Sequence, residues 1–146
     1  MLRGNSLAKI DGKGRLKVPS LFRSDSDVEL GTEFFVTSIG GASARIYPIE
    51  IYSRIETRLR QASSVQPLVA KLRNALNFFG QMATMDVQGR IMIHPLLRDK
   101  ARLDGEVAVL GQQDYLEVWN RTAIEEQLRN DPLTGDELRE LASFGI

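Results

Sequence analysis

Arginine and lysine side chains gather around two copies of one short residue pattern in this chain. The first repeat runs from Ala8 to Arg23 and the second from Ala83 to Arg98, and the Asp, Gly and Arg positions recur 75 residues later. Only the proline slips, by one place. Basic side chains neutralise phosphates, and arginine can also bind guanine edges with two hydrogen bonds. A repeat that keeps turn residues and basic residues together therefore indicates a duplicated unit with a shared surface.

The spacing inside each repeat predicts a strand, a tight turn, a second strand and a short helical turn. In the first repeat, the Asp11 side chain can bond the backbone two residues on, and Gly14 supplies the positive φ angle of a tight turn. Leu16 and Val18 then alternate with Lys17, which is the period of a half-buried strand. The proline that follows ends the strand and suits the start of a helix. We interpret the aspartate of each repeat as a turn-forming residue.

The strand after the turn places its basic side chains on one face. Because side chains alternate along a strand, Arg15 and Lys17 share the face opposite the apolar residues, and Lys9 and Lys13 flank the same turn. Lys17 alone is equally well explained as a charge that keeps an exposed β surface in solution. The candidate DNA-binding residues at and before the first repeat are Arg3, Lys9, Lys13, Arg15, Lys17 and Arg23. The candidates in the second repeat are Arg90 and Arg98.

The second repeat keeps fewer cations than the first. Gln88 and Met92 stand where the first repeat has Lys13 and Lys17. We therefore expect Arg90 to contribute less to DNA binding, on a surface used for packing or subunit contact.

Charge is distributed unevenly along the chain, although 19 basic and 19 acidic residues balance. The segment 1–23 holds six basic residues and one acid, whereas the segment 124–146 holds six acids and two arginines. The basic end of such a polarised molecule is the natural meeting point for a polyanion.

The residues argue against an enzyme, a metal site and a bound cofactor. There is no cysteine, which excludes disulfides, thiolate catalysis and cysteine-based zinc sites. The one histidine, His94, has no partner at ligand spacing, and Gly12-Lys13-Gly14 lacks the spacing of a phosphate-binding loop. The chain shows neither a membrane-length apolar run nor a signal peptide, so we expect a cytoplasmic protein with no membrane partner.

Each half continues with strands and then a helix. The predicted strands are 33–37 and 44–47 in the first half, and 106–110 and 116–119 in the second. The predicted turns between them are Gly40-Gly41 and 111–114, and the predicted helices are 48–62, 67–79 and 123–129. Thr134 begins a signal for a last short helix, and 62–66 reads as a linker too short to separate domains. We divide the chain into a first repeat with its helix (1–62), a bridging segment (63–79) and a second repeat with C-terminal helices (80–146), forming one compact unit.

The pattern Asp-x-x-Gly-Arg-φ-x-φ-Pro-x-x-φ-Arg, where φ is an apolar residue, resembles the swapped-hairpin motif of AbrB/SpoVT-type transcription factors. Two copies 75 residues apart, after the opening Leu2-Arg3-Gly4-Asn5, are similar to the MraZ family of bacterial regulators. The strings Leu110-Gly111-Gln112 and Leu116-Glu117-Val118-Trp119 also resemble that family's second half.

The resemblance implies an α+β fold in which the two hairpins of one chain interleave as an intramolecular pseudo-dimeric barrel. It also implies a closed ring of copies that binds short, G-rich direct repeats in double-stranded DNA. Such proteins usually repress their own operon, in the division and cell-wall gene cluster, which places them at the nucleoid. By position, the DNA-contacting arginine falls on Arg15, and the arginine at the helix end falls on Arg23. Ala8 departs from the motif, because AbrB-like chains often have arginine there.

AbrB-type hairpins also serve antitoxins, so the alternative function is a protein-binding, antitoxin-like module. Antitoxins of that kind usually carry a long, disordered, acidic tail. The acidic tail here is short and has helix signals, which favours the regulator.

Overall fold

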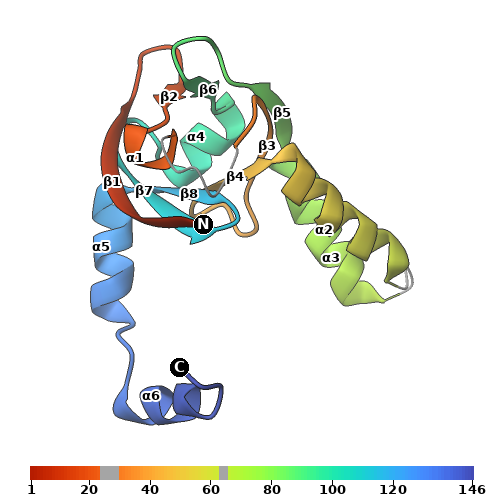
Figure 1. Cartoon of the computed structure of the whole chain (residues 1–146), viewed down its shortest axis with the longest axis vertical. Helices are drawn as coiled ribbons and strands as arrows, with labels where there is room; N and C mark the ends of the chain where they lie inside the picture. The colour runs from red at the N-terminus through yellow and green to blue at the C-terminus, as the bar shows by residue number, and fades with distance from the viewer. Residues whose placement is uncertain (24–29, 63–65) are drawn as a thin grey trace.

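The computed structural model describes residues 1–23, 30–62 and 66–146, and its eight strands form one antiparallel sheet (Figure 1). The strands are β1 (Leu2–Ile10), β2 (Arg15–Lys17), β3 (Glu33–Thr37), β4 (Ala44–Pro48), β5 (Gln81–Thr84), β6 (Arg90–Met92), β7 (Gly105–Gln113) and β8 (Leu116–Asn120). The helices in the described residues are α1 (Ser20–Arg23), α2 (Ile49–Gln61), α3 (Pro67–Phe78), α4 (Pro95–Ala101), α5 (Arg121–Asn130) and α6 (Gly135–Ala142). The fold class is therefore α+β, as predicted.

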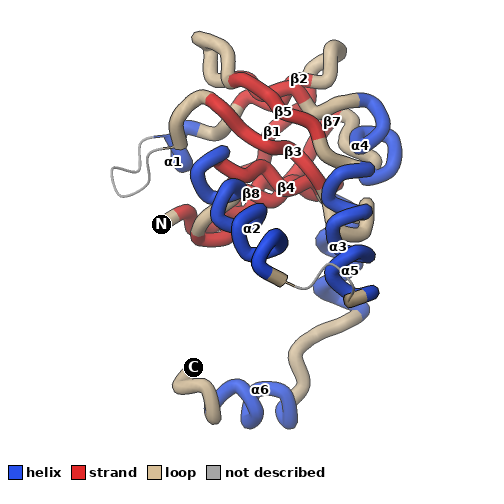
Figure 2. The backbone as a smooth tube through the Cα atoms, turned by 90° about the vertical axis from the view of Figure 1, so that its right-hand side faces the viewer, coloured by secondary structure: helices blue, strands red, loops and turns tan. Residues whose placement is uncertain are grey.

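The two halves of the chain exchange strands within the sheet. The strand order is β5-β3-β4-β8-β7-β1-β2-β6, and the sheet curls into a nearly closed barrel (Figure 2). β1 of the first half pairs with β7 of the second, and the matching strands β5 and β3 pair in the same way. β2 pairs with its own counterpart β6, and β4 with its counterpart β8. This interleaving confirms the predicted intramolecular pseudo-dimer.

The barrel interior is filled by the apolar residues that alternate with charges along the repeats. Leu16 and Ile91 are opposite each other in the β2–β6 pair, and neither has exposed surface. Val18 and Ile93, two residues further on, are also fully buried. Both repeats therefore direct their apolar face inward, which leaves Lys17 and its neighbours on the outside.

Most of the predicted elements are present with ends that differ by one or two residues. The strand at 33–37 matches β3, and the strand at 44–47 gains one residue in β4. The predicted linker at 62–66 lies mostly outside the described residues, since its residues 63–65 are not described. The last helix begins as expected, because the Thr134 hydroxyl accepts a hydrogen bond from the Glu137 backbone and the Glu137 carboxylate accepts one from the Thr134 backbone.

The predicted turn at 111–114 is displaced by about one residue, because the chain reverses at 112–115, where the backbone N–H of Gln112 donates to the backbone oxygen of Tyr115 at 2.9 Å. β7 continues to Gln113, and Gly111 pairs with both Gly4 on β1 and Leu116 on β8. A Cβ atom at Gly111 would collide with the backbone of Arg3, so this glycine allows two strands to approach closely. Glycine is typical both of a turn and of a strand position where another backbone comes close. The sequence alone therefore cannot distinguish the two at Gly111.

Two helical projections leave the barrel in different directions (Figures 1 and 2). We call α2 and α3 the helical arm, and residues 131–146, which include α6, the terminal arm. α5 connects the terminal arm to the barrel. Within the described residues, no helix is long and apolar enough to cross a membrane.

Candidate nucleic-acid interface

The turn of the first repeat fixes the position of Arg15. One carboxylate oxygen of Asp11, Oδ1, accepts hydrogen bonds from the backbone N–H groups of Lys13 and Arg15, both at 2.9 Å. The other oxygen, Oδ2, accepts from Nε of Arg15 at 2.8 Å. The backbone N–H of Arg15, and then its guanidinium, hold the pKa of the Asp11 carboxyl below its usual value. Asp11 is therefore turn-forming, as predicted, and it also binds the arginine side chain.

The second repeat reproduces this geometry. Asp86 Oδ1 accepts from the backbone of Gln88 and Arg90 at 2.9 Å, and Oδ2 accepts from Nε of Arg90 at 2.8 Å. The backbone of Arg90 likewise lowers the pKa of the Asp86 carboxyl. Both turns lie at the same end of the barrel (Figures 1 and 2). The duplicated sequence therefore presents two similarly held guanidinium groups at one end of the molecule.

The β2–β6 pair joins the cations of the two repeats on one outer surface. Lys17 is directly opposite Arg90, and Arg15 is directly opposite Met92. Directly opposite residues of an antiparallel pair are neighbours on the same face. Arg90 therefore belongs to the same surface as the cations of the first repeat, which the sequence alone could not show.

A basic cavity of about 600 Å³ lies beside this surface. Among the predicted DNA-binding residues, it brings together Lys9 from β1, Lys17 from β2 and Arg23 from α1. The full lining is Ser6, Leu7, Ala8, Lys9, Lys17, Val18, Pro19, Ser20 and Arg23. Its three cations and two serines suit an anionic group such as a phosphate.

Lys13 and Arg3 lie outside this basic cavity. Lys13 is exposed in the turn, and Arg3 is exposed near the opposite end of β1. Arg3 and Lys9 are six residues apart on one strand, so their side chains leave the same face of β1. The predicted residues thus form a band along β1 and the hairpin.

Arg23 and Arg98 have a position that sequence reasoning missed. The guanidinium of Arg98 lies against Gly14 of the first repeat, and that of Arg23 lies against Gly89 of the second. Each arginine occupies the place where a Cβ atom at that glycine would stand. Nε of Arg98 also donates to the backbone oxygen of Ile93 at 2.7 Å. These two arginines therefore pack across the repeats and cover the two turns.

The surface of the second repeat that corresponds to the basic cavity carries one cation, Arg98, in place of three. Thr84 and Met92 take the places of Lys9 and Lys17, and Met82 takes the place of Leu7. Met82 and Met92 are 53% and 42% exposed. The two repeats therefore have the same backbone arrangement here, but the first has the more basic surface.

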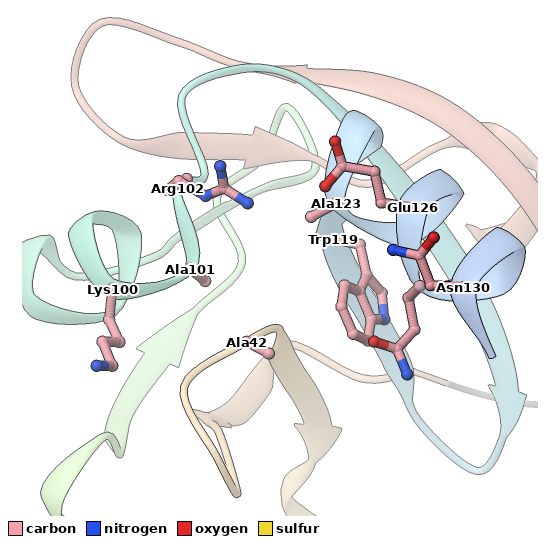
Figure 3. Close-up of a pocket in the computed structure, with 9 residues that line it drawn as sticks. Ala42, Lys100, Ala101, Arg102, Trp119, Ala123, Glu126 and Asn130 are labelled. Atoms are coloured by element: carbon pink, nitrogen blue, oxygen red, sulfur yellow. The ribbon is translucent and has the colours of Figure 1, made fainter.

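The single histidine and a second cavity lie away from the candidate DNA-binding residues. Burial lowers the pKa of His94, which favours the neutral imidazole. Among the described residues, no three His, Cys, Asp or Glu side chains are placed to hold a metal ion. A separate cavity of about 270 Å³ lies at the base of α5, where Arg102 and Glu126 point toward one another beside the Trp119 ring (Figure 3). None of the predicted DNA-binding residues lines it.

Comparison with known proteins places the chain among related regulators. A family model described as "MraZ protein, putative antitoxin-like" matches residues 80–141. The transcriptional regulator MraZ of Acidobacterium capsulatum is 39% identical over 146 residues, which is 100% of each chain. The protein of the same name from Koribacter versatilis is 41% identical over 147 residues, again 100% of each chain. That of Citrobacter koseri is 34% identical over 133 residues, covering 90% of this chain and 87% of the relative.

The relatives from Acidobacterium capsulatum and Koribacter versatilis match over the whole chain, including both repeats and both helical projections. Their shared name describes regulators of transcription, which are not enzymes. The chain belongs to the MraZ family of transcriptional regulators.

Proposed function

We propose that this protein binds short direct repeats in double-stranded DNA and represses its own operon, in the division and cell-wall gene cluster. In this proposal it acts at the nucleoid, in the cytoplasm, as a homo-oligomeric closed ring. The observation that carries the proposal is the guanidinium of Arg15, held at the turn by Asp11 beside a cavity lined by three cations. The name of the relatives supports the regulatory role.

Arg15 supplies the base contact. Its bond to Asp11 uses Nε–H, so the two terminal NH₂ groups remain for the O6 and N7 atoms of a guanine. The side chain is 26% exposed, so part of it is open to a ligand. A group already held in its binding geometry loses less conformational entropy on binding.

The other cations supply phosphate contacts. Lys9, Lys17 and Arg23 converge on the basic cavity, and Lys13 extends from the turn beside Arg15. Phosphate contacts fix the register of a protein on the duplex, and base contacts then select the sequence. Arg3 continues the band along β1.

The antitoxin-like alternative has one observation in its favour, the description of the matching family model. An antitoxin of that kind would use its acidic tail to wrap a toxin. Here residues 135–142 form a helix with a complete capping box, which is a preformed element and not an unstructured tail. This structure favours the regulator.

Footprinting of the full-length protein on the DNA upstream of its own gene tests the proposal. We expect protection of two or more short repeats of the same orientation, and no protection of a scrambled fragment of equal length and composition. Equal affinity for both fragments would overturn sequence-specific recognition.

A further inference from the structure

The chain has four methionines and no cysteine, so methionine is its only oxidisable sulfur. Peroxides convert the methionine thioether to a sulfoxide, and the side chains that are open to solvent are the most accessible to them. Met1, Met82 and Met92 are exposed, whereas Met85 is partly buried against the core. Oxidation at the surface of this protein therefore concerns three positions.

Met92 is the exposed methionine that lies beside the arginine proposed to bind a base. It is directly opposite Arg15 in the β2–β6 pair, at the turn end of the barrel (Figure 1). The Cβ atoms of such a pair are about 4.5–5.5 Å apart on one face, which puts the ends of the two long side chains within reach of each other. The guanidinium of Arg98 lies against Gly14, the residue before Arg15. Met92 thus lies among the cations at this end of the barrel.

The matching position in the first repeat has a different chemistry. Lys17 is opposite Arg90, just as Met92 is opposite Arg15. A lysine keeps its positive charge in the presence of peroxide, whereas a methionine gains a polar oxygen. Of these two equivalent positions, only the one beside Arg15 can therefore be changed by an oxidant.

A sulfoxide at Met92 would compete with DNA for the Arg15 side chain. Asp11 holds Nε of Arg15, which leaves the two terminal NH₂ groups as donors. The sulfoxide oxygen is a hydrogen-bond acceptor, and a bond donated by an ionised group is stronger than one between neutral groups. A bond from Arg15 to this oxygen would use the donors that guanine O6 and N7 require. The sulfoxide itself would stay on the outside of the barrel, where it disturbs no core packing.

We propose that Met92 is an oxidation site that controls DNA binding through Arg15. In the reaction, the sulfur lone pair attacks one oxygen of hydrogen peroxide and the O–O bond breaks. The departing hydroxide takes the proton from the transferred oxygen and becomes water. Sulfur gives two electrons to the peroxide, and methionine becomes methionine sulfoxide. Methionine sulfoxide reductases reverse this change, so the switch can follow the level of oxidant. The inference rests on the proposed contact of Arg15 with DNA and adds how that contact is regulated.

Peroxide treatment of the full-length protein, followed by titration with the operator fragment, tests the proposal. Hydrogen peroxide should weaken binding by about tenfold, the loss expected when one bidentate contact with guanine is removed. Mass spectrometry of the peptide that contains Met92 should show one added oxygen, and thermal melting should change little. Treatment with both methionine sulfoxide reductases, one for each epimer, should restore the affinity.

Variants of two methionines show whether the effect belongs to Met92. Met92→Leu removes the sulfur, so peroxide should leave its operator affinity unchanged. Met82→Leu is the matched control: Met82 is more exposed but is opposite Phe35, so this variant should lose affinity as the wild type does. Met92→Gln places an oxygen acceptor opposite Arg15 and should bind weakly before any oxidation.

Oxidation of the Arg15→Ala variant shows whether the effect passes through the arginine. At low salt, where phosphate contacts keep binding measurable, peroxide should cause little further loss once Arg15 is absent. Equal losses with and without Arg15 would overturn the proposal, and so would a Met92→Leu variant as sensitive to peroxide as the wild type. Normal operator affinity in untreated Arg15→Ala is a different result, since it would overturn the base contact in the proposed function.

Discussion

At the scale of single residues, the pair Asp11–Arg15 joins the formation of the turn to the position of the arginine that we propose contacts DNA. The same carboxylate that closes the turn through two backbone N–H groups also holds Nε of the arginine. A side chain supported in this way keeps its tip in one place, which is the usual requirement of a precise binding site. The residue that shapes the hairpin therefore also orients the group proposed to read a base.

Replacing Arg15 by alanine should abolish specific binding while the protein stays folded. A bidentate contact with guanine contributes about 1–3 kcal/mol, and the loss multiplies when several subunits bind one DNA. We expect operator affinity to fall at least tenfold in a fluorescence titration. Thermal melting should change little, because a partly exposed ion pair contributes about 0–1 kcal/mol. Normal operator affinity in the folded variant would contradict the assignment.

Replacing both Asp11 and Asp86 by asparagine should make stability less dependent on acid. Both carboxyls have pKa values below the usual 3.8 because of the hydrogen bonds they accept. Their contribution to stability is therefore complete above pH 3.8 and is lost as the pH falls through the lower, folded-state pKa values. Urea unfolding at several pH values should show the wild type more stable at neutral pH, with the difference closing below pH 3.8. A difference that stays constant in acid would exclude this role.

The residue-level prediction from sequence succeeded where contacts are local. Asp-x-x-Gly predicts the turn because the hydrogen bonds that the Asp11 carboxylate and backbone accept within it join residues no more than four positions apart. The placement of Arg23 against Gly89 could not be predicted, since it joins residues far apart in the chain. DNA contact by these residues stays a prediction.

At the scale of elements, each hairpin turn depends on a glycine with a positive φ angle and on a hydrogen bond to the other repeat. Gly14 has a φ angle of +85° and Gly89 one of +79°, which side chains disfavour. The backbone oxygen of Gly14 also accepts from Ile93, and that of Gly89 accepts from Val18. Each turn is thus tied to the strand of the other repeat, so strain at one turn reaches both halves.

Gly14→Val and Gly89→Val should each destabilise the protein. The left-handed conformation costs an ordinary residue about 1–2 kcal/mol, which corresponds to a melting temperature lower by about 2–8 °C. The new side chain must also displace Arg98 or Arg23, which adds to the loss. Unchanged melting would show that these turns differ from the ones described.

Gly12→Val provides the matched control in the same turn. No atom lies within 4 Å of a Cβ built at Gly12, and the second repeat already has Val87 at this place. Melting should therefore stay close to that of the wild type, since valine adds neither a clash nor an unfavourable φ angle.

Lys13 and Lys17 together should set part of the salt dependence of DNA binding. Each phosphate contact adds about 0.9 to the slope of log affinity against log salt. Lys13→Gln with Lys17→Met copies the residues of the second repeat, and should lower the slope by up to about 1.8 and weaken binding to all sequences. A slope equal to that of the wild type would mean that neither lysine contacts DNA.

The sequence predicted most strands and helices because their apolar residues repeat at the period of the element. It failed at Gly111, where a glycine inside a strand allows the backbone of β1 to come close. It could not predict the β2–β6 register either, because that pairing joins strands from opposite halves of the chain. Such pairing is decided by the closed barrel and not by local preference.

At the scale of the whole molecule, a nearly symmetric framework carries asymmetric surfaces. The two repeats hold Arg15 and Arg90 with the same bonds and the same distances. Their surroundings differ, since Arg15 is followed along the surface by the basic cavity, and the matching surface beside Arg90 has Thr84 and Met92. The duplication thus preserved the framework while the two faces diverged.

Arg15→Ala and Arg90→Ala, compared in one titration across several salt concentrations, should reveal how the repeats share the DNA. We expect the first change to cost more affinity, because Arg15 acts together with the cations of the basic cavity. Arg90 lies opposite Lys17, so its removal should still lower the salt slope by about one phosphate contact. The matched bonds to Asp11 and Asp86 make each variant the structural control for the other, since both should lose similar stability. Equal losses of affinity would mean that the repeats bind DNA as true symmetry mates, and that the differences between their surfaces serve another contact.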